Sequence, residues 1–440
     1  MNYLLSQVNH ERRPLTARKK TQFSLTRITR LLTDLGNPHK SLRTVHIAGS
    51  KGKGSTAAML SYMLQANGLK VGVYTSPHLL DIRERIMIGT EKISEAEFTR
   101  LVAKIAAIVA DYKTGCPTFF DMLTAMAFKY FADREVDVAI IETGLGGRLD
   151  STNVIEPEVC GLTSISFDHV PQLGTTLSDI AQEKAGVFKK GVTVISAEQT
   201  GEVKQILKKA ADQARSPLMF VGDEIGFTYR FESSKTGGPQ ARIGLTTPNC
   251  RYDHLAVPLV GQHQAINCGV AIGLLDELKN KGFELDDEAS VAGLSKVSLP
   301  GRMQTLCTSP RVVADGAHNA SSISALMRAI GQNVPYDSMV VIFGCCADKD
   351  INGMLQHVLL GADKVIFTDF GSPRAADPAD LARAFAEITS GRMAQSVPTL
   401  AKAVENAEKA ITRDDLICIT GSFYLVGEAI RFFEDHPHRV

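Results

Sequence analysis

The residues with the clearest chemistry lie in a glycine-rich run, GSKGKGST, at positions 49–56. Glycines let backbone N–H groups curl around phosphate oxygens, and the N-terminus of a following helix adds positive potential. Lys53 is placed to contact the β- and γ-phosphates of a nucleotide, and the Ser55 hydroxyl is placed to bind Mg²⁺. The strict phosphate-loop pattern GxxxxGK[ST] is not matched, because Gly54 separates Lys53 from Ser55. A purely structural glycine turn is the alternative, but the context favours a phosphate loop. Its predicted binding residues are Gly49, Gly52, Lys53, Gly54, Ser55 and Thr56.

Polar residues at the ends of two apolar runs are the next candidates. Glu142 ends the run 138–142, and a carboxylate there can face Mg²⁺ across from the phosphate loop. Asp168 and His169 follow a second apolar run, and we interpret the histidine as functional rather than structural. Lys184 lies in the segment IAQEKAG, whose composition alone predicts a solvated helix face.

Strand-like and helix-like patterns alternate along the chain, which argues for a mostly parallel sheet wrapped by helices. Between residues 222 and 260 this pattern weakens and predicts short antiparallel strands or hairpins. A break at 298–301 precedes a second, smaller α/β region. Ligands of open α/β sheets bind at the carboxyl ends of strands, so we expect the site in a cleft between two domains. The predicted strands are 44–49, 71–76, 137–143, 159–166, 193–197, 311–315, 339–345, 364–369 and 416–420; the predicted helices are 55–66, 94–112, 121–131, 176–189, 263–280 and 288–295.

Composition limits the class of protein. The 440 residues carry 48 basic and 48 acidic side chains, so no field of one sign is available to hold nucleic acid or an anionic membrane. No apolar run reaches the roughly 18–20 residues that span a bilayer, and the first residues lack the apolar core of a signal peptide. The eight cysteines are scattered without a CxxC pair and are predicted to be reduced thiols. We therefore expect a cytoplasmic protein, with a monomer as the default.

Nine motifs occur in one order over about residues 20 to 430: HIAGSKGKGST, TSPHL with RERI, IETGLGGRLDSTNV, DHVPQLGTTLSDIAQEKAGVFK, GQHQAIN, PGRMQ, ADGAHN, DKD and GSFYLVGE. Together they resemble the folylpolyglutamate synthase / dihydrofolate synthase family, a branch of the Mur-ligase superfamily. The resemblance implies a Mur-ligase-like α/β fold. We place a large, mostly parallel-sheet ATPase domain of the phosphate-loop type at residues 1–298, and a smaller Rossmann-like glutamate-ligase domain at 299–440.

The resemblance also assigns ATP and metal residues in the larger domain. Lys53 is expected to hold ATP phosphates, while Ser55 and Glu142 bind one Mg²⁺ ion. His169 is expected to help bind a second Mg²⁺. Lys184 is expected to carry a carbamate, which turns a cation into an anionic metal ligand.

Further residues are implied in nucleotide and substrate binding. Asn267 is expected near the adenine, Arg302 at a phosphate, and Asp315 and His318 near the nucleotide and the incoming glutamate. The catalytic residues implied are Lys53, Lys184 and His318. Lys349, Ser422 and Tyr424 resemble the rest of the glutamate site, and Ser76, Pro77, His78 and Phe120 resemble the region that covers the pterin. Core packing is an equal alternative for Phe120.

One departure from the resemblance lies in the phosphate loop, where Ser50 and Lys51 replace Thr and Asn and add a positive charge. The implied reaction joins L-glutamate to a reduced folate or to dihydropteroate through an acyl phosphate. Folylpolyglutamate synthesis is favoured, and dihydrofolate synthesis, alone or in addition, stays open. A different Mur-type ligase is disfavoured by the short segment before Gly49. A nucleotide-hydrolysing switch is disfavoured by the motifs DGAHN and GSFY.

Overall fold

The computed structural model describes residues 2–8, 24–234, 238–389 and 391–436. Backbone contacts divide the chain into two compact units. Unit 1 comprises Met1–Arg230, Arg242–Pro258 and His263–Val297, and unit 2 comprises Phe231–Ala241, Leu259–Gln262 and Ser298–Val440. The domain limits 1–298 and 299–440 remain a prediction, since two short segments before residue 298 are grouped with unit 2.

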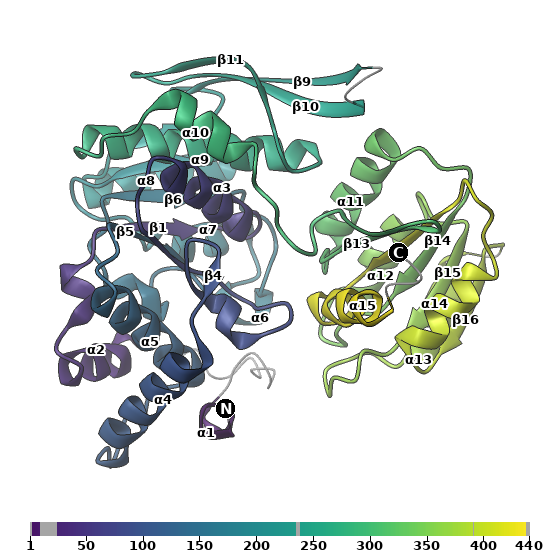
Figure 1. Cartoon of the computed structure of the whole chain (residues 1–440), viewed down its shortest axis with the longest axis horizontal. Helices are drawn as coiled ribbons and strands as arrows, with labels where there is room; N and C mark the ends of the chain where they lie inside the picture. The colour runs from purple at the N-terminus through teal and green to yellow at the C-terminus, as the bar shows by residue number, and fades with distance from the viewer. Residues whose placement is uncertain (1, 9–23, 235–237, 390, 437–440) are drawn as a thin grey trace. The chain divides into compact units, whose positions relative to one another are not determined.

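The large sheet of unit 1 has the strand order β4-β3-β2-β5-β1-β6-β7-β8 (Figure 1). Strands β2, β5, β1, β6, β7 and β8 pair in parallel, while β3 and β4 form an antiparallel edge. A parallel strand that is buried on both faces consists of a continuous apolar run. The main strands of this sheet were therefore predictable from the sequence. The strands are β1 Thr44–Ala48, β2 Val71–Tyr74, β3 Ile86–Ile88, β4 Glu91–Lys92, β5 Val138–Glu142, β6 Val159–Leu162, β7 Thr193–Ser196 and β8 Leu218–Phe220.

Helices cover both faces of this sheet. On one face, glycines inside strands let helices approach closely: a Cβ on Gly161 would press on Leu274 of α9. On the other face, a Cβ on Gly72 would press on the Phe131 ring of α5. The helices are α1 Asn2–Ser6, α2 Leu25–Asp34, α3 Lys53–Ala66, α4 Glu95–Ala110, α5 Phe119–Asp133, α6 Val170–Leu173, α7 Leu177–Ala185, α8 Gly201–Ala214, α9 Gln262–Asn280 and α10 Asp287–Leu294.

The weakly patterned region 222–260 contains antiparallel pairing, as predicted. Strands β9 Gly226–Ser234, β10 Gly238–Thr246 and β11 Arg251–Ala256 form a sheet in the order β11-β10-β9. Residues 235–237 of this region lie outside the described residues.

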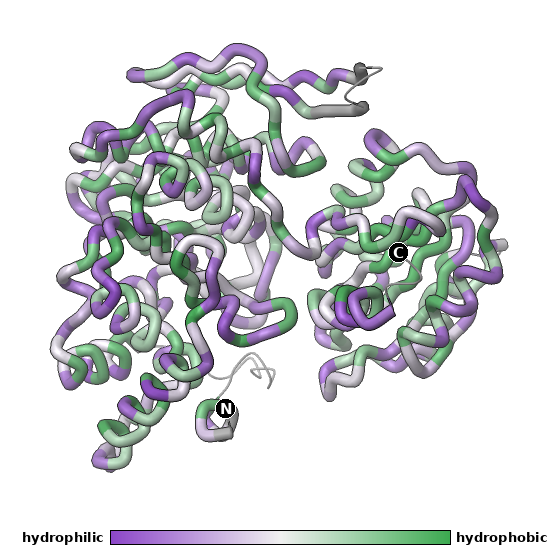
Figure 2. Tube along the Cα trace, in the orientation of Figure 1, coloured by the Kyte–Doolittle hydropathy of each residue, from purple (hydrophilic) through white to green (hydrophobic). Residues whose placement is uncertain are grey.

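Unit 2 contains a mixed sheet in the order β12-β13-β17-β14-β15-β16, in which β12 alone pairs antiparallel. Its central strands β14 and β17 are buried throughout, and Figure 2 shows hydrophobic residues concentrated along the strands. Helices α11, α12 and α13 contribute to one core with these strands, and α14 and α15 contact the sheet as well. The elements are β12 Gln304–Thr308, β13 Arg311–Asp315, α11 Ala320–Asn333, β14 Met339–Phe343, α12 Ile351–Val358, β15 Lys364–Thr368, α13 Pro378–Ile388, β16 Met393–Val397, α14 Leu400–Glu408, β17 Leu416–Thr420 and α15 Phe423–Asp435.

Several predicted limits were wrong. The helix predicted for 176–189 ends at Ala185, where Gly186 follows, and the strand predicted for 159–166 ends at Leu162. The helix predicted from residue 55 already begins at Lys53, because Gly52 supplies the left-handed turn that opens it. Strands β3, β4, β8, β12 and β16 were missed, and β16 is an exposed edge strand with little apolar patterning. Among the described residues, no helix combines the length and the apolar character that crossing a bilayer requires.

His46 on the central strand β1 is buried, and its Nε2 atom lies 2.8 Å from the Thr152 hydroxyl. Burial, with a smaller contribution from Lys189, lowers the pKa of His46 to about 3. The unfolded chain takes up a proton below about pH 6.5, whereas the folded chain stays neutral at this site down to about pH 3. His46 therefore costs stability progressively as the pH falls from 6.5 towards 3.

We expect wild-type protein to lose about 2 kcal/mol of unfolding free energy through this residue between about pH 7.5 and pH 5. The variant His46→Gln, which cannot take up the proton, should show a smaller loss over the same range. Urea unfolding at the two pH values measures both. His357→Gln, in the last turn of α12, is the control and should behave like the wild type. Equal losses in His46→Gln and the wild type would contradict the assignment.

Candidate active site

The predicted phosphate loop connects β1 to α3 in unit 1. Gly49 and Gly52 both have left-handed backbone angles, φ 144° and φ 88°, and Gly52 caps the helix that Lys53 begins. A Cβ on Gly52 would clash with the side-chain amide of Asn267, so α9 lies directly against the loop. The structure therefore brings Asn267 to the phosphate loop, and its role at the adenine stays a prediction.

Two lysines converge on one carbonyl of this loop. The Nζ atoms of Lys53 and Lys184 donate hydrogen bonds to the Gly49 oxygen over 3.2 and 2.7 Å. Lys184 is only 2% exposed, so the solvated helix face that its composition suggested is wrong. Burial, followed by the charge of Lys53, lowers the pKa of Lys184 to about 7. A neutral amine is therefore well populated at this position near neutral pH.

Glu142 and Ser55 supply hard oxygen atoms beside Lys53. One carboxylate oxygen of Glu142 lies 3.7 Å from the Lys53 ammonium, and the other accepts a hydrogen bond from the Ser76 backbone over 3.2 Å. Ser55 is buried in the first turn of α3. The described residues contain no group of three or more His, Cys, Asp or Glu side chains able to hold a metal ion by themselves. The pair still fits Mg²⁺, which uses one or two protein oxygens together with substrate phosphates and water.

Thr56 lies one residue further along α3 and is fully buried. Within the described chain its hydroxyl has no hydrogen-bond partner, although its backbone N–H donates to the Gly52 carbonyl over 2.9 Å. Gly54 has no tight neighbour, since a Cβ there would come no closer than 3.6 Å to Glu142. The binding roles of both residues stay predictions.

Asp168 and His169 follow β6 and form a close pair. His169 adopts φ 47° as the residue that precedes α6, and its Nε2 atom lies 3.7 Å from an Asp168 carboxylate oxygen. The Asp168 charge also acts on Lys51 and Lys184. His169 thus belongs to the same charged cluster as Lys184, and its metal-binding role stays a prediction.

One of the residues expected to cover a pterin, Ser76, contacts Glu142. Ser76 donates to Glu142, Pro77 is exposed, and the His78 Nδ1 atom accepts a hydrogen bond from Arg85 over 2.9 Å. The partly buried Phe120 ring packs 5.9 Å from the Tyr74 ring and against Gly144, where a Cβ would clash with it. This packing leaves both interpretations of Phe120 open.

Three predicted residues of unit 2 lie close together. Arg302 and His318 lie near the Phe423 ring, and Asp315 binds backbone N–H groups beside them. The Asp315 carboxylate accepts hydrogen bonds from the backbone N–H groups of Met303 and Ala317, each over 2.9 Å. Burial raises the pKa of Asp315, against the opposing charge of Arg302. The Arg302 guanidinium lies 4.6 Å from the Phe423 ring centre, and the His318 ring lies 5.2 Å from it. The structure therefore gathers these three predicted residues.

A second group in unit 2 lies after β14, β15 and β17. Ser422 caps α15, and Tyr424 stacks on Phe370 at 5.8 Å. Lys349 follows Asp348, which accepts two hydrogen bonds from Arg374, over 2.8 and 2.9 Å. Arg374 was not predicted from the sequence, because a single arginine in a loop gives no signal until its partner is known; the structure shows it partly buried.

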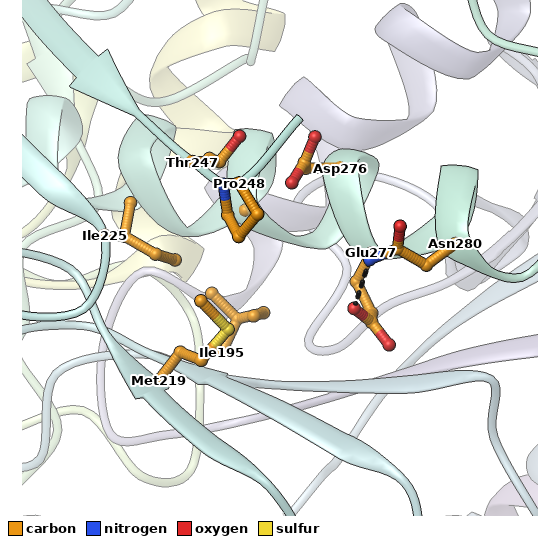
Figure 3. A pocket seen from close by; sticks show the side chains of 9 residues that line it. Ile195, Met219, Ile225, Thr247, Pro248, Asp276, Glu277 and Asn280 are labelled. Atoms are coloured by element: carbon orange, nitrogen blue, oxygen red, sulfur yellow. Dashed lines mark hydrogen bonds between the residues drawn. The ribbon is translucent and has the colours of Figure 1, made fainter. Parts of the chain in front are cut away.

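A small pocket in unit 1 lies elsewhere. Figure 3 shows it between strands β7 and β8 and the C-terminal half of α9, where Asn280 donates to Glu277 over 2.9 Å. None of the predicted site residues lines it. This pocket is therefore not the predicted nucleotide or substrate site.

Comparison with known proteins identifies relatives over nearly the whole chain. The family described as "Mur ligase middle domain" matches residues 47–275, and "Mur ligase, glutamate ligase domain" matches 301–423. A Bacillus subtilis protein named dihydrofolate synthase/folylpolyglutamate synthase is 34% identical over 409 residues, 92% of this chain and 93% of the relative.

Two solved structures share the fold. Mycobacterium tuberculosis folylpolyglutamate synthase complexed with ADP and AMPPCP matches with a TM-score of 0.87 and 34% identity, covering 93% of this chain and 95% of that one. E. coli FolC in complex with DHPP and ADP matches with a TM-score of 0.86 and 27% identity, covering 99% of this chain and 97% of that one. These matches confirm the predicted Mur-ligase-like α/β fold.

The close approach of Gly52 to Asn267 predicts a large effect of a single methyl group. We expect Gly52→Ala to destabilise the protein by about 1–3 kcal/mol through backbone strain, with a further loss from the clash. ADP affinity should fall as well, because the loop must shift away from Asn267. Thermal unfolding and ADP titration measure the two effects.

Gly68→Ala is the matched control, since Gly68 has nearly the same backbone angle, φ 82°, but no neighbour within 4 Å. It should show the backbone strain alone. If both variants lost the same stability and bound ADP equally well, the contact with Asn267 would not constrain the loop.

Proposed function

The chain belongs to the folylpolyglutamate synthase / dihydrofolate synthase family of the Mur ligase superfamily and is an ATP-dependent ligase, and we propose that its preferred reaction adds L-glutamate to a reduced folate. The observation that carries the site assignment is the convergence of Lys53 and Lys184 on the Gly49 carbonyl, with Glu142 beside Lys53. It supports a site for the charged phosphates of ATP at this loop.

The first step is phosphoryl transfer. An oxygen of the substrate carboxylate attacks the γ-phosphorus of ATP, ADP leaves, and an acyl phosphate forms. Lys53 and the backbone N–H groups of the loop would stabilise the negative charge on the phosphates. Ser55 and Glu142 would hold Mg²⁺, which supplies further charge neutralisation when bound.

The second step forms the amide. The amine of L-glutamate attacks the acyl carbon, a tetrahedral intermediate forms, and inorganic phosphate leaves while the nitrogen loses a proton. His318, Lys349, Ser422 and Tyr424 would position the glutamate, and Arg302 and Asp315 would contact the nucleotide.

Lys184 would take part as a carbamate. A neutral lysine amine adds to CO₂ with loss of a proton, and the lowered pKa of Lys184, about 7, keeps that neutral form available. The product is an anion that, together with His169, would suit a second Mg²⁺ ion. An unmodified ammonium at this position would repel the metal.

Product analysis tests the proposed reaction. With ATP, Mg²⁺ and L-glutamate, we expect tetrahydrofolate to gain one glutamate, detected by mass, with one phosphate released per conjugate. Dihydropteroate in place of tetrahydrofolate tests the alternative activity, dihydrofolate synthesis. Lys53→Ala should lose ligation by a factor of at least about 10² with an unchanged fold, since it removes a preorganised phosphate contact. Phosphate release that ignores both pterins and forms no conjugate would refute the proposal.

Carbamylation of Lys184 predicts a dependence on CO₂. Ligation by the wild type should fall when bicarbonate is depleted and recover when it is restored. Lys184→Ala should be nearly inactive and partly rescued by short carboxylic acids, which replace the missing anion. ¹³C NMR with ¹³C-bicarbonate should show one carbamate signal in the wild type that Lys184→Ala lacks. Full activity of Lys184→Ala would eliminate this role.

A further inference from the structure

The phosphate loop and the segment before His169 are joined by a set of backbone and hydroxyl hydrogen bonds. The Ser50 and Lys51 N–H groups both donate to the Ser164 carbonyl, over 3.0 and 3.4 Å. The Ser50 hydroxyl donates to the Ser166 carbonyl over 2.9 Å and accepts from the Ser166 N–H over 3.1 Å. Residues 50 and 51 therefore fix the course of the chain that leads to Asp168 and His169.

The Lys51 side chain continues this connection. Its ammonium is buried and has no hydrogen-bond partner within the described part of the chain. A buried charge without a hydrogen bond is unfavourable unless an opposite charge lies near it. Burial lowers the pKa of Lys51 to about 8, while the charge of the Asp168 carboxylate acts to raise it. Asp168 is thus the anion that compensates this ammonium.

Asp168 in turn contacts His169. The Asp168 side chain is 11% exposed and the His169 side chain 44%, and the two lie 3.7 Å apart. His169 also has φ 47°, a left-handed angle that is strained for a residue with a side chain. A carboxylate beside an imidazole fixes the orientation of the ring and the nitrogen that is free to bind a ligand. Lys51, Lys184 and His169 are among the charged groups that act on Asp168.

We propose that Lys51 and Asp168 are positioning residues that hold His169 in place beside the phosphate loop. Lys51 neutralises Asp168, and Asp168 orients the imidazole. Lys51 therefore acts on a divalent ion through His169 and not on the nucleotide directly. This inference rests on the proposed function, in which His169 binds a metal ion.

The test measures Mn²⁺ binding to the ADP complex of the full-length protein by electron paramagnetic resonance. Lys51→Met and Asp168→Asn should each weaken Mn²⁺ binding about 10-fold, the effect expected from removing support behind a metal ligand. Lys51→Arg should restore affinity to within about 3-fold of the wild type, because it keeps the charge. The double variant Lys51→Met with Asp168→Asn should be no weaker than either single variant, since the two residues act as a unit.

ADP affinity without divalent ions separates this role from a direct phosphate contact. It should stay within about 2-fold of the wild type in Lys51→Met, whereas a phosphate ligand would lose far more. Lys129→Met is the matched control, because it removes a lysine that forms an ion pair with Asp133 on α5, away from the phosphate loop. It should bind Mn²⁺ like the wild type. Lys51→Gln repeats the measurement if Lys51→Met does not fold.

Three results would overturn the inference: wild-type Mn²⁺ affinity in Lys51→Met, additive effects in the double variant, or weakened ADP binding without metal. His169→Ala distinguishes this inference from the function on which it rests. If His169→Ala binds Mn²⁺ like the wild type, the metal role of His169 fails. If His169→Ala loses Mn²⁺ while Lys51→Met and Asp168→Asn keep it, only the positioning role fails.

Discussion

The arrangement of the larger unit depends on the concentration of positive charge around one backbone carbonyl. Lys53 and Lys184 share the Gly49 oxygen, and the Lys51 ammonium lies buried in the same loop. Removing cations from water is unfavourable, so such a loop needs anions close by. The protein supplies Glu142, which ends β5, and Asp168, which lies in the segment after β6; these two strands flank β1. The remaining positive charge suits the phosphates of a nucleotide.

The parallel sheet explains why these groups meet. Strands β5, β1 and β6 are neighbours, so the residues that follow their carboxyl ends lie at one edge of the sheet. Glu142 ends β5, the phosphate loop follows β1, and Asp168 lies in the segment after β6. The same principle applies within unit 2, where Asp315 ends β13 and Ser422 follows the adjacent β17. Two sets of polar residues thus arise from one topological rule.

The sequence predicted this framework because its strands are buried on both faces and read as apolar runs. The short edge strands β3 and β4 and the exposed strand β16 carry no such signal, which explains why they were missed. Site residues within motifs were identifiable, but the burial of Lys184 and the pairing of Arg374 with Asp348 depend on contacts between distant segments. From the sequence, Lys51 was interpreted only as an added charge, because the residues next to it do not predict that Asp168 lies near it in the fold.

The hydrogen bond between Lys184 and Gly49 bears on why a lysine stands at a position proposed to bind metal. A carbamate nitrogen keeps one hydrogen, so a modified Lys184 can still donate to the Gly49 carbonyl. The carboxylate added to that nitrogen carries two oxygens that can bind a metal ion. An aspartate or glutamate at residue 184 would offer oxygen ligands but no donor, and the Gly49 carbonyl would keep only Lys53. A carbamylated lysine would therefore donate a hydrogen bond to the loop through its nitrogen and bind the metal ion through its added carboxylate. In that case the negative charge of Lys184 would depend on CO₂, and that of Glu142 would not.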